Sequence, residues 1–384
     1  MSNSFATPVP GEGKPTAPGK PVSQRLLSLD FMRGLTMVLL TLESAQLYTV
    51  LKYPLAGTPF IHVLHEFWHH PWHGIHLWDC VQPVFMFVAG TAMAFSFNKQ
   101  RQQGMSWNQS LRKTLKRCGW LFFWGVLDYA VTKDGLELRL WDVLTQLSFT
   151  TLVAFLIIRW PAKYQIVVSF LCLLIPEFLY RFTHIPNFDQ PFTDQHNFGN
   201  YMDMVLMGRI NDGGWVAINC ISTSAHTIWG VLAGQLLLSD KPGRDKIRYL
   251  IGSGVVLLAL GFGLDWTGIT PIIKRIATSS FVLASGGWAL LFLALCYWWV
   301  DISGHKKHLQ LFLIFGMNSI FIYLFIEIVG DRWFTEYVFD ITNPVFGWIR
   351  LPVNLALVLG SLVVFGLEAG IMYFLYKKKI FFKL

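Results

Sequence analysis

Charged side chains are scarce in this chain. Only 14% of its 384 residues are Asp, Glu, Lys or Arg, whereas 53% are hydrophobic. Soluble domains carry roughly a quarter charged residues, so this shortage argues against an ordinary water-soluble protein. Apolar runs of about 20 residues, the length that crosses a bilayer as a helix, recur along the chain. The composition therefore predicts an all-α polytopic membrane protein.

Cysteine is also scarce, and no internal repeat is present. The five cysteines all lie in or at the edge of apolar runs: Cys80, Cys118, Cys172, Cys220 and Cys296. No C-x-x-C pair occurs, which argues against a disulfide framework and a structural zinc site. Residues 1–24 lack an apolar core and are rich in Pro, Gly, Ser and Thr. We interpret them as a disordered cytoplasmic tail without a signal peptide, and residues 25–384 as one transmembrane domain.

The apolar runs predict about ten transmembrane helices, with both termini on the same side. The expected segments are 31–51, 77–98, 114–132, 141–158, 166–183, 215–238, 249–265, 280–302, 311–329 and 353–376. Lys and Arg are concentrated on one side of these spans, with six in the 99–117 connection alone. The positive-inside rule makes that side cytoplasmic. The net charge of +8 is then explained by topology and lipid contact, and nucleic acid is not an expected partner.

Histidine is abundant in one stretch, residues 61–83, which falls on the opposite, extracytoplasmic side. It holds six of the eleven histidines: His62, His65, His69, His70, His73 and His76. Glu66 lies among them and Asp79 follows. Because imidazole titrates near physiological pH, this stretch is suited to proton handling or metal binding.

Three interpretations of the stretch stay open. Residues 65–69, HEFWH, fit the H-E-x-x-H pattern of zinc proteases, although Pro71 would end a helix soon afterwards. The stretch could equally be a solvated loop whose histidines are incidental. A third possibility is one catalytic histidine oriented by a carboxylate, for which Asp79 is the nearest downstream candidate.

Several polar residues fall inside predicted spans, where a polar group is costly unless it faces a partner or a cavity. Glu43 lies well inside the first span, and we expect it to have a function there. The alternative interpretation is a neutral carboxyl group that is hydrogen-bonded to a neighbouring hydroxyl. Other groups lie at outer helix ends or deeper: Asp79, Asp128, Asp142, Glu327, Gln146, His226 and Asn318. Together they could line one cavity, although each alone could be an ordinary polar group of the helix bundle.

Several motifs resemble the heparan-α-glucosaminide N-acetyltransferase and YeiB-like transmembrane acyltransferases. Residues 25–34 resemble the R-x-x-S-x-D-x-x-R-G opening of that family, and residues 69–90 resemble its H-x-x-W-x-G…D-x-V-x-P-x-F-x-F-x-x-G block. Residues 230–234, 316–319 and 377–384 also resemble the family. The likeness extends in order over nearly the whole chain after residue 24.

The resemblance implies a multi-helix acyltransferase that takes acetyl-CoA from the cytosol and an amine or hydroxyl of a saccharide on the far side. It implies that His69 acts as general base or acyl carrier and that Asp79 orients it, with no metal. We expect three cations to bind the CoA phosphates, namely Arg33, Lys113 and Arg117, although Lys113 could equally be a positive-inside anchor. Candidate substrate-binding residues are Glu43, Trp72, Gln146, His226, Asn318 and Glu327.

The chain departs from the family where an acceptor would bind. Glu43-Ser44 stands where relatives often have Asn, Val143–Gln146 replaces a V-L-Q-R-like run, and Asp212–Gly214 replaces a P-E-G-like entry. The acceptor is therefore less certain than the acyl chemistry. The expected partners are a lipid bilayer, an acyl donor and a saccharide acceptor, with a homodimer possible. The compact form of the chain resembles bacterial members of the family, and this resemblance implies a bacterial inner-membrane location. The alternatives are a proton-coupled transporter or flippase and, third, the metalloprotease.

Overall fold

The protein is a helical bundle in which each expected apolar segment contains a helix. The computed structural model describes residues 26–132 and 135–382, so the expected disordered tail, 1–24, lies outside the described part. The first half contains α1 (Leu27–Ser44), α2 (Leu47–Leu55), α3 (Phe60–His65), the 3₁₀ helix η1 (Leu77–Cys80), α4 (Val81–Gln102), α5 (Trp107–Ala130), α6 (Val143–Ile157) and α7 (Ala162–Phe182). The second half contains α8 (Phe198–Met207), α9 (Asn219–Leu238), α10 (Gly243–Trp266), α11 (Ser279–Cys296), η2 (Tyr297–Ile302), α12 (Gln310–Met317), α13 (Ser319–Phe325), η3 (Ile326–Phe334), α14 (Thr335–Trp348) and α15 (Val353–Lys377).

All ten expected segments are helical, but fewer helices have the length and apolarity of a full span. Five helices of the described residues meet that standard, or up to seven if two bent pairs are each one span. The bends are 67° between α1 and α2 and 78° between α12 and the helix that starts at Ser319. α6 has only 15 residues, and α5 carries four Lys or Arg in its first half. A polytopic all-helical architecture is therefore confirmed, while the count of ten spans is not.

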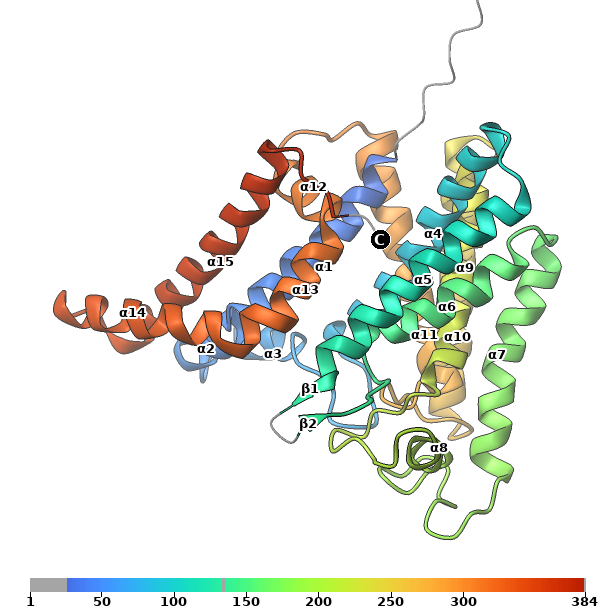
Figure 1. Cartoon of the computed structure of the whole chain (residues 1–384), viewed down its shortest axis with the longest axis horizontal. Coiled ribbons are helices and arrows are strands. Elements are labelled where there is room, and N and C mark those ends of the chain that lie inside the picture. The colour runs from blue at the N-terminus through green and yellow to red at the C-terminus, as the bar shows by residue number, and fades with distance from the viewer. Residues whose placement is uncertain (1–25, 133–134, 383–384) are drawn as a thin grey trace, which may run out of the picture.

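Figure 1 shows two groups of helices side by side. α4 to α7 and α9 to α11 form one group, and α1, α2 and α12 to α15 form the other. A short hairpin of two strands, β1 (Val131–Thr132) and β2 (Gly135–Leu136), each two residues long, lies at the lower end of the bundle, near α8. The described chain begins at the opposite, upper end, and after the top of α15 its C-terminal segment turns back into the upper half of the bundle.

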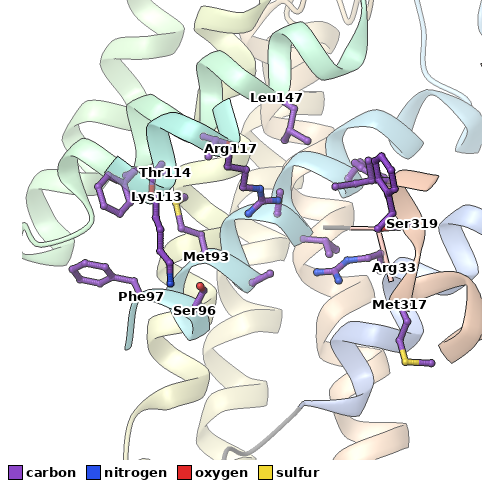
Figure 2. A pocket seen from close by; sticks show the side chains of 18 of the residues that line it. Arg33, Met93, Ser96, Phe97, Lys113, Thr114, Arg117, Leu147, Met317 and Ser319 are labelled. Atoms are coloured by element: carbon purple, nitrogen blue, oxygen red, sulfur yellow. The ribbon is translucent and has the colours of Figure 1, made fainter. Parts of the chain in front are cut away.

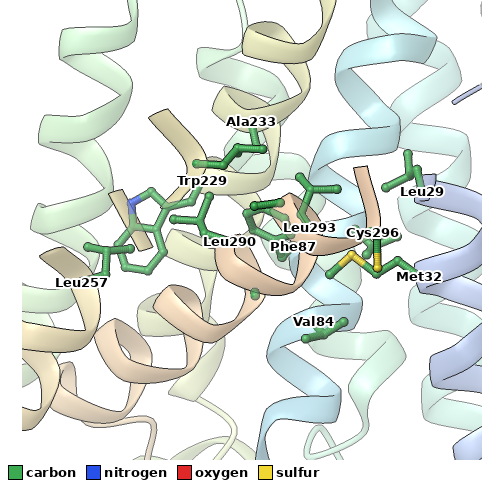
Figure 3. Close-up of a cluster of buried hydrophobic side chains, with 14 of the residues drawn as sticks. Leu29, Met32, Val84, Phe87, Trp229, Ala233, Leu257, Leu290, Leu293 and Cys296 are labelled. Atoms are coloured by element: carbon green, nitrogen blue, oxygen red, sulfur yellow. The ribbon is translucent and has the colours of Figure 1, made fainter. Parts of the chain in front are cut away.

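The main apolar core joins the two groups where α1, α4, α9, α10 and α11 meet. Figure 3 shows part of this cluster, including Met32 from α1, Phe87 from α4, Trp229 from α9 and Leu293 from α11. All four side chains are nearly or fully buried. Trp229 also donates a hydrogen bond of 2.9 Å to the Ser169 hydroxyl, which ties α9 to α7. These contacts fix α4, and α4 directly follows the histidine stretch.

Glycines bring the most closely packed helices into backbone contact. A Cβ atom added at Gly90 of α4 would lie 2.0 Å from the carbonyl oxygen of Thr227, and one at Gly230 of α9 would lie 2.0 Å from that of Phe87. α1 and α12 show the same reciprocal arrangement, in which Gly34 and Gly316 each meet the other helix's backbone. Small residues allow this approach, which is a common way to pack membrane helices.

We expect Gly90→Val and Gly230→Val each to destabilise the protein, because the added methyl groups would force α4 away from α9. Overpacking of this kind costs about 1–3 kcal/mol or more. Thermal unfolding in detergent measures the loss. Gly252→Val is the matched control, because a Cβ at Gly252 of α10 meets no atom within 4 Å. Equal losses in all three variants would contradict the close-packing argument.

Candidate active site

The site is built around a hydrogen bond between His69 and Asp79. The His69 Nδ1 atom lies 2.9 Å from Asp79 Oδ1. Asp79 is completely buried, and its second oxygen, Oδ2, accepts the backbone N–H groups of His70 at 3.1 Å and His76 at 2.9 Å. These bonds hold the carboxylate in one orientation, and therefore also the imidazole.

The local sequence explains why the histidine stretch is a loop here. α3 ends at His65, and residues 66–76 between α3 and η1 are irregular. Gly74 has a φ of +143°, and a Cβ there would lie 2.5 Å from the His70 ring. A glycine at position 74 thus lets the chain turn back on itself. This turn allows Asp79, in the first turn of η1, to reach the His69 ring.

The H-E-x-x-H residues do not lie on one helix. His65 is the last residue of α3, and the Glu66 carboxylate accepts the backbone N–H of Leu77 at 2.9 Å. His69 directs Nδ1 toward Asp79. Among the described residues, no group of three or more His, Cys, Asp or Glu is placed to hold a metal ion. The helical geometry of an H-E-x-x-H zinc site is therefore not formed.

A lysine that the sequence analysis did not select completes the site. The Lys274 ammonium nitrogen, Nζ, lies 3.0 Å from His69 Nδ1 and 3.5 Å from Asp79 Oδ1. It also lies 5.1 Å from the centre of the Trp215 ring, which in turn meets the His69 ring edge-on at 5.9 Å between centres. Lys274 is only 7% exposed.

Burial and charge shift the pKa values of both basic groups. Desolvation lowers the pKa of His69, the Asp79 hydrogen bond opposes this shift, and the Lys274 charge adds to it. Burial also lowers the pKa of Lys274 to about 8, against the raising effect of the Asp79 carboxylate. The site therefore favours an uncharged imidazole near neutral pH.

His69 and Lys274 face a cavity of about 270 Å³, here called the histidine cavity. Its wall contains the carboxylates of Glu43, Asp142 and Glu327 and the aromatic rings of Trp78, Trp141, Trp215 and Tyr323. Glu43 accepts a 3.0 Å hydrogen bond from the Trp78 indole, and Asp142 accepts one of 3.1 Å from Tyr323. Polar groups beside flat rings could bind a small polar molecule through both hydrogen bonds and stacking.

A second cavity of about 560 Å³ lies toward the other end of the bundle and is here called the basic cavity. Figure 2 shows that the guanidinium groups of Arg33 and Arg117 point into the same space. Lys113 lies on α5, as Arg117 does, and also lines this cavity. None of its described lining residues is Asp or Glu. Phe85 lines both cavities, so they meet at this ring.

The structure brings together some of the expected site residues and separates others. His69, Glu43 and Glu327 line the histidine cavity, and Gln146 lies just behind it, bonded to Gln82 of the wall at 2.6 Å. Three others lie elsewhere. Trp72 donates a 2.8 Å hydrogen bond to the Phe192 carbonyl, which ties the histidine stretch to the connection between α7 and α8.

His226 and Asn318 also lie outside both cavities. His226 is fully buried between α9 and α11, with Nε2 3.0 Å from the Ser285 hydroxyl. Asn318 exchanges two hydrogen bonds of 2.9 Å with the backbone of Ile380 and Phe382, and so holds the C-terminal segment against the bundle. Polar residues within spans are thus divided here between the cavity and purely structural contacts.

Residues 25–198 match the sequence profile of heparan-alpha-glucosaminide N-acetyltransferase, catalytic. The resemblance to this family is confirmed over these residues, which make up a little less than half of the chain. The matched segment contains the His69–Asp79 pair and all three cations of the basic cavity, and it supports a membrane acyltransferase in general. No curated protein matches the chain.

Lys274 and Trp215 lie outside the part of the chain that matches the acetyltransferase family. The sequence around Lys274 nonetheless has a feature that could have marked this residue as a candidate. The sequence 269–280 places a lysine among apolar residues, on the side of the predicted membrane that carries few cations. Its apolar neighbours Ile272, Ile273 and Ile276 are almost completely buried, which draws the lysine inward with them. Nothing in the sequence indicated that it would meet His69.

We expect Asp79→Ala to destabilise this acetyltransferase-like protein strongly. It would leave two buried backbone N–H groups and the Lys274 charge without their partner. Breaking one side of a buried ion pair costs about 3–5 kcal/mol. Thermal or denaturant unfolding in detergent measures the loss.

The double variant Asp79→Ala/Lys274→Met supplies the control for this prediction. Because it removes the stranded charge as well, it should recover part of the lost stability. Asp189→Ala, at an exposed carboxylate, should have little effect. A double variant less stable than Asp79→Ala would contradict the ion-pair argument.

Proposed function

We propose that the protein is a membrane acyltransferase that moves an acetyl or similar short acyl group from acetyl-CoA to an amine or hydroxyl of a saccharide. The main support for this proposal is that Phe85 lines both the basic cavity and the histidine cavity. The His69–Asp79 pair lies on the side of Phe85 that faces away from the basic cavity. A polyanionic donor and a polar acceptor would thus reach one imidazole from opposite directions.

The basic cavity suits the phosphate-bearing donor. Arg33, Lys113 and Arg117 supply three positive charges, and arginine pairs with phosphate through two parallel hydrogen bonds. The wall between these cations and Phe85 is largely apolar, with Val88, Ala89 and Leu147. A flexible pantetheine arm could lie along it and carry the thioester toward the histidine cavity.

The histidine cavity suits a saccharide acceptor. The carboxylates of Glu43 and Glu327 accept hydrogen bonds from hydroxyl or ammonium groups, and Trp78, Trp141 and Trp215 offer flat faces for a sugar ring. The volume of about 270 Å³ accommodates a small terminal sugar rather than a long chain. A longer saccharide would extend out of its mouth.

His69 would act through Nε2, because Nδ1 faces Asp79. In direct transfer, Nε2 takes the proton from the acceptor N–H or O–H as that atom attacks the thioester carbon. The new N–C or O–C bond forms, the C–S bond breaks, and the proton passes to the CoA thiolate. In the covalent route, Nε2 attacks the thioester carbon first, and the C–S bond breaks to release the CoA thiolate. The acceptor then attacks the acyl-imidazole, the bond from the acyl carbon to Nε2 breaks, and the acceptor's proton passes to the thiolate.

The proposed orientation places the basic cavity on the cytoplasmic side and the histidine cavity on the far side. The distribution of Lys and Arg along the sequence supports it. Arg33 and Phe382, near the two ends of the described chain, both line the basic cavity, which agrees with this orientation. A bacterial inner membrane is the location that fits this orientation.

We expect His69→Ala to abolish acyl transfer while the protein stays folded and binds CoA, because the base is lost but the basic cavity is untouched. Loss of a general base typically costs about 10²–10⁴-fold in rate. Consumption of acetyl-CoA in the presence of glucosamine measures the rate. His62→Ala, on exposed α3, is the matched control. Transfer that survives in His69→Ala would exclude this mechanism.

We expect Arg117→Gln to weaken CoA binding to purified protein by about tenfold or more, because one charge-assisted hydrogen bond is worth roughly 1.5–3 kcal/mol. Lys116→Gln removes a charge from the neighbouring position of α5, which is exposed and does not line the cavity. Binding calorimetry compares the two variants. Absence of CoA binding by the unmodified protein would instead favour the transporter, for which the carboxylates of the histidine cavity would serve proton coupling.

A further inference from the structure

Lys274 and Asp79 compete for the same nitrogen of His69. Nζ of Lys274 lies 3.0 Å from Nδ1, and Oδ1 of Asp79 lies 2.9 Å from it. A ring nitrogen carries either a proton, with which it donates, or a lone pair, with which it accepts. Nδ1 therefore cannot donate to Asp79 and accept from a lysine ammonium at the same time.

Two arrangements of protons follow from the 3.0 Å contact between Nζ of Lys274 and Nδ1 of His69. When Lys274 is an ammonium, it donates to the Nδ1 lone pair, and the single imidazole proton sits on Nε2. When Lys274 is a neutral amine, Nδ1–H donates to Asp79 and Nε2 has a free lone pair. Only the second arrangement gives the histidine cavity a base.

We propose that Lys274 is a positioning residue whose charge decides which nitrogen of His69 carries the proton, and so switches Nε2 between donor and base. The catalytic consequence rests on the acyltransferase function proposed above. The control of the tautomer itself does not, since it concerns only the free protein. The switch would keep the imidazole from attacking a thioester until Lys274 has lost its proton.

The structure holds Lys274 firmly enough for this role. Its loop, residues 267–278, is docked on the histidine stretch by an isolated β-bridge between His73 and Ile273 and by the bond from Gly74 N to Ile272 O at 2.9 Å. His73 Nε2 also lies 2.7 Å from Asp265 Oδ1. On the other side, the Arg181 guanidinium of α7 donates to the Ile269 carbonyl.

The charged and titratable groups that face Lys274 and His69 determine in which direction the pKa of each residue is shifted. Burial lowers the pKa of Lys274 to about 8, and the Asp79 carboxylate is the main group that opposes this shift by favouring the ammonium form; Cys80 and Glu43 also face the lysine. Asp79, Lys274 and Arg275 face His69. As pH rises through the pKa of Lys274, the ammonium disappears and the fraction of His69 with a free Nε2 increases. Activity that depends on this base should therefore rise with a midpoint near pH 8.

Two substitutions of Lys274 separate this switch from a simple need for positive charge. In Lys274→Met the competing donor is absent, so Nδ1–H stays on Asp79, and the rate should no longer rise between about pH 7 and pH 9. In Lys274→Arg the guanidinium stays charged throughout that range. His69 should then remain a donor, and transfer at pH 8.5 should fall by about tenfold or more.

Nitrogen-15 NMR of histidine-labelled protein tests the tautomer without any donor or acceptor. The His69 signals are identified by their loss in His69→Ala. In the unmodified protein the proton should move from Nε2 to Nδ1 as pH rises through about 8. It should stay on Nδ1 in Lys274→Met and on Nε2 in Lys274→Arg. Arg275→Met, the adjacent cation of the same loop, should leave the midpoint unchanged.

The outcomes are distinct. A His69 tautomer that is the same in all variants would overturn the switch, as would transfer that survives in Lys274→Arg and is lost in Lys274→Met. An acetyl group found on Lys274 after incubation with acetyl-CoA alone would also overturn it, because the amine would then be an acyl acceptor. A tautomer that follows Lys274 in a protein without acyl transfer would support the switch and refute the proposed function instead.

Discussion

A single buried carboxylate determines the arrangement of the site. Asp79 is fully buried, and its oxygens meet one imidazole, one ammonium group and two backbone N–H groups. A carboxylate is stable in such a place only when it is surrounded by donors. To supply them, the histidine stretch must turn back on itself, and the loop carrying Lys274 must come over from the far end of α10. The positions of both loops follow from this requirement.

The two cavities differ in the charged groups that line them, and this difference gives the bundle a direction. Three cations and no described carboxylate line the basic cavity, whereas the histidine cavity contains three carboxylates. Phe85 stands between them on α4, the helix that the core and the glycine contacts hold most closely. A donor and an acceptor of opposite charge would therefore be guided to opposite sides of the same ring. This separation is what a transfer across the membrane plane would require.

The family-like motifs serve packing as much as chemistry. Four of their glycines, Gly34, Gly90, Gly230 and Gly316, lie at the two sites where helices touch backbone to backbone. The residues 316–319, expected to help bind substrate through Asn318, instead hold the C-terminal segment and the contact with α1. Residues of a family-like motif can thus make close packing and backbone contacts in this structure.

The sequence by itself determined the helical membrane architecture, because apolar runs and scarce charge leave no other way to satisfy a buried backbone. The family resemblance also pointed to the His69–Asp79 pair and to the cations Arg33 and Arg117, and the structure places the members of each pair close together. Only the tertiary structure decided that Lys274, 205 positions from His69, meets it, and that His226 is a core residue. The physical reason is that spacing along one helix predicts which face a side chain occupies. Which other helix that face meets depends on packing among all of them, and a linear pattern does not carry that information.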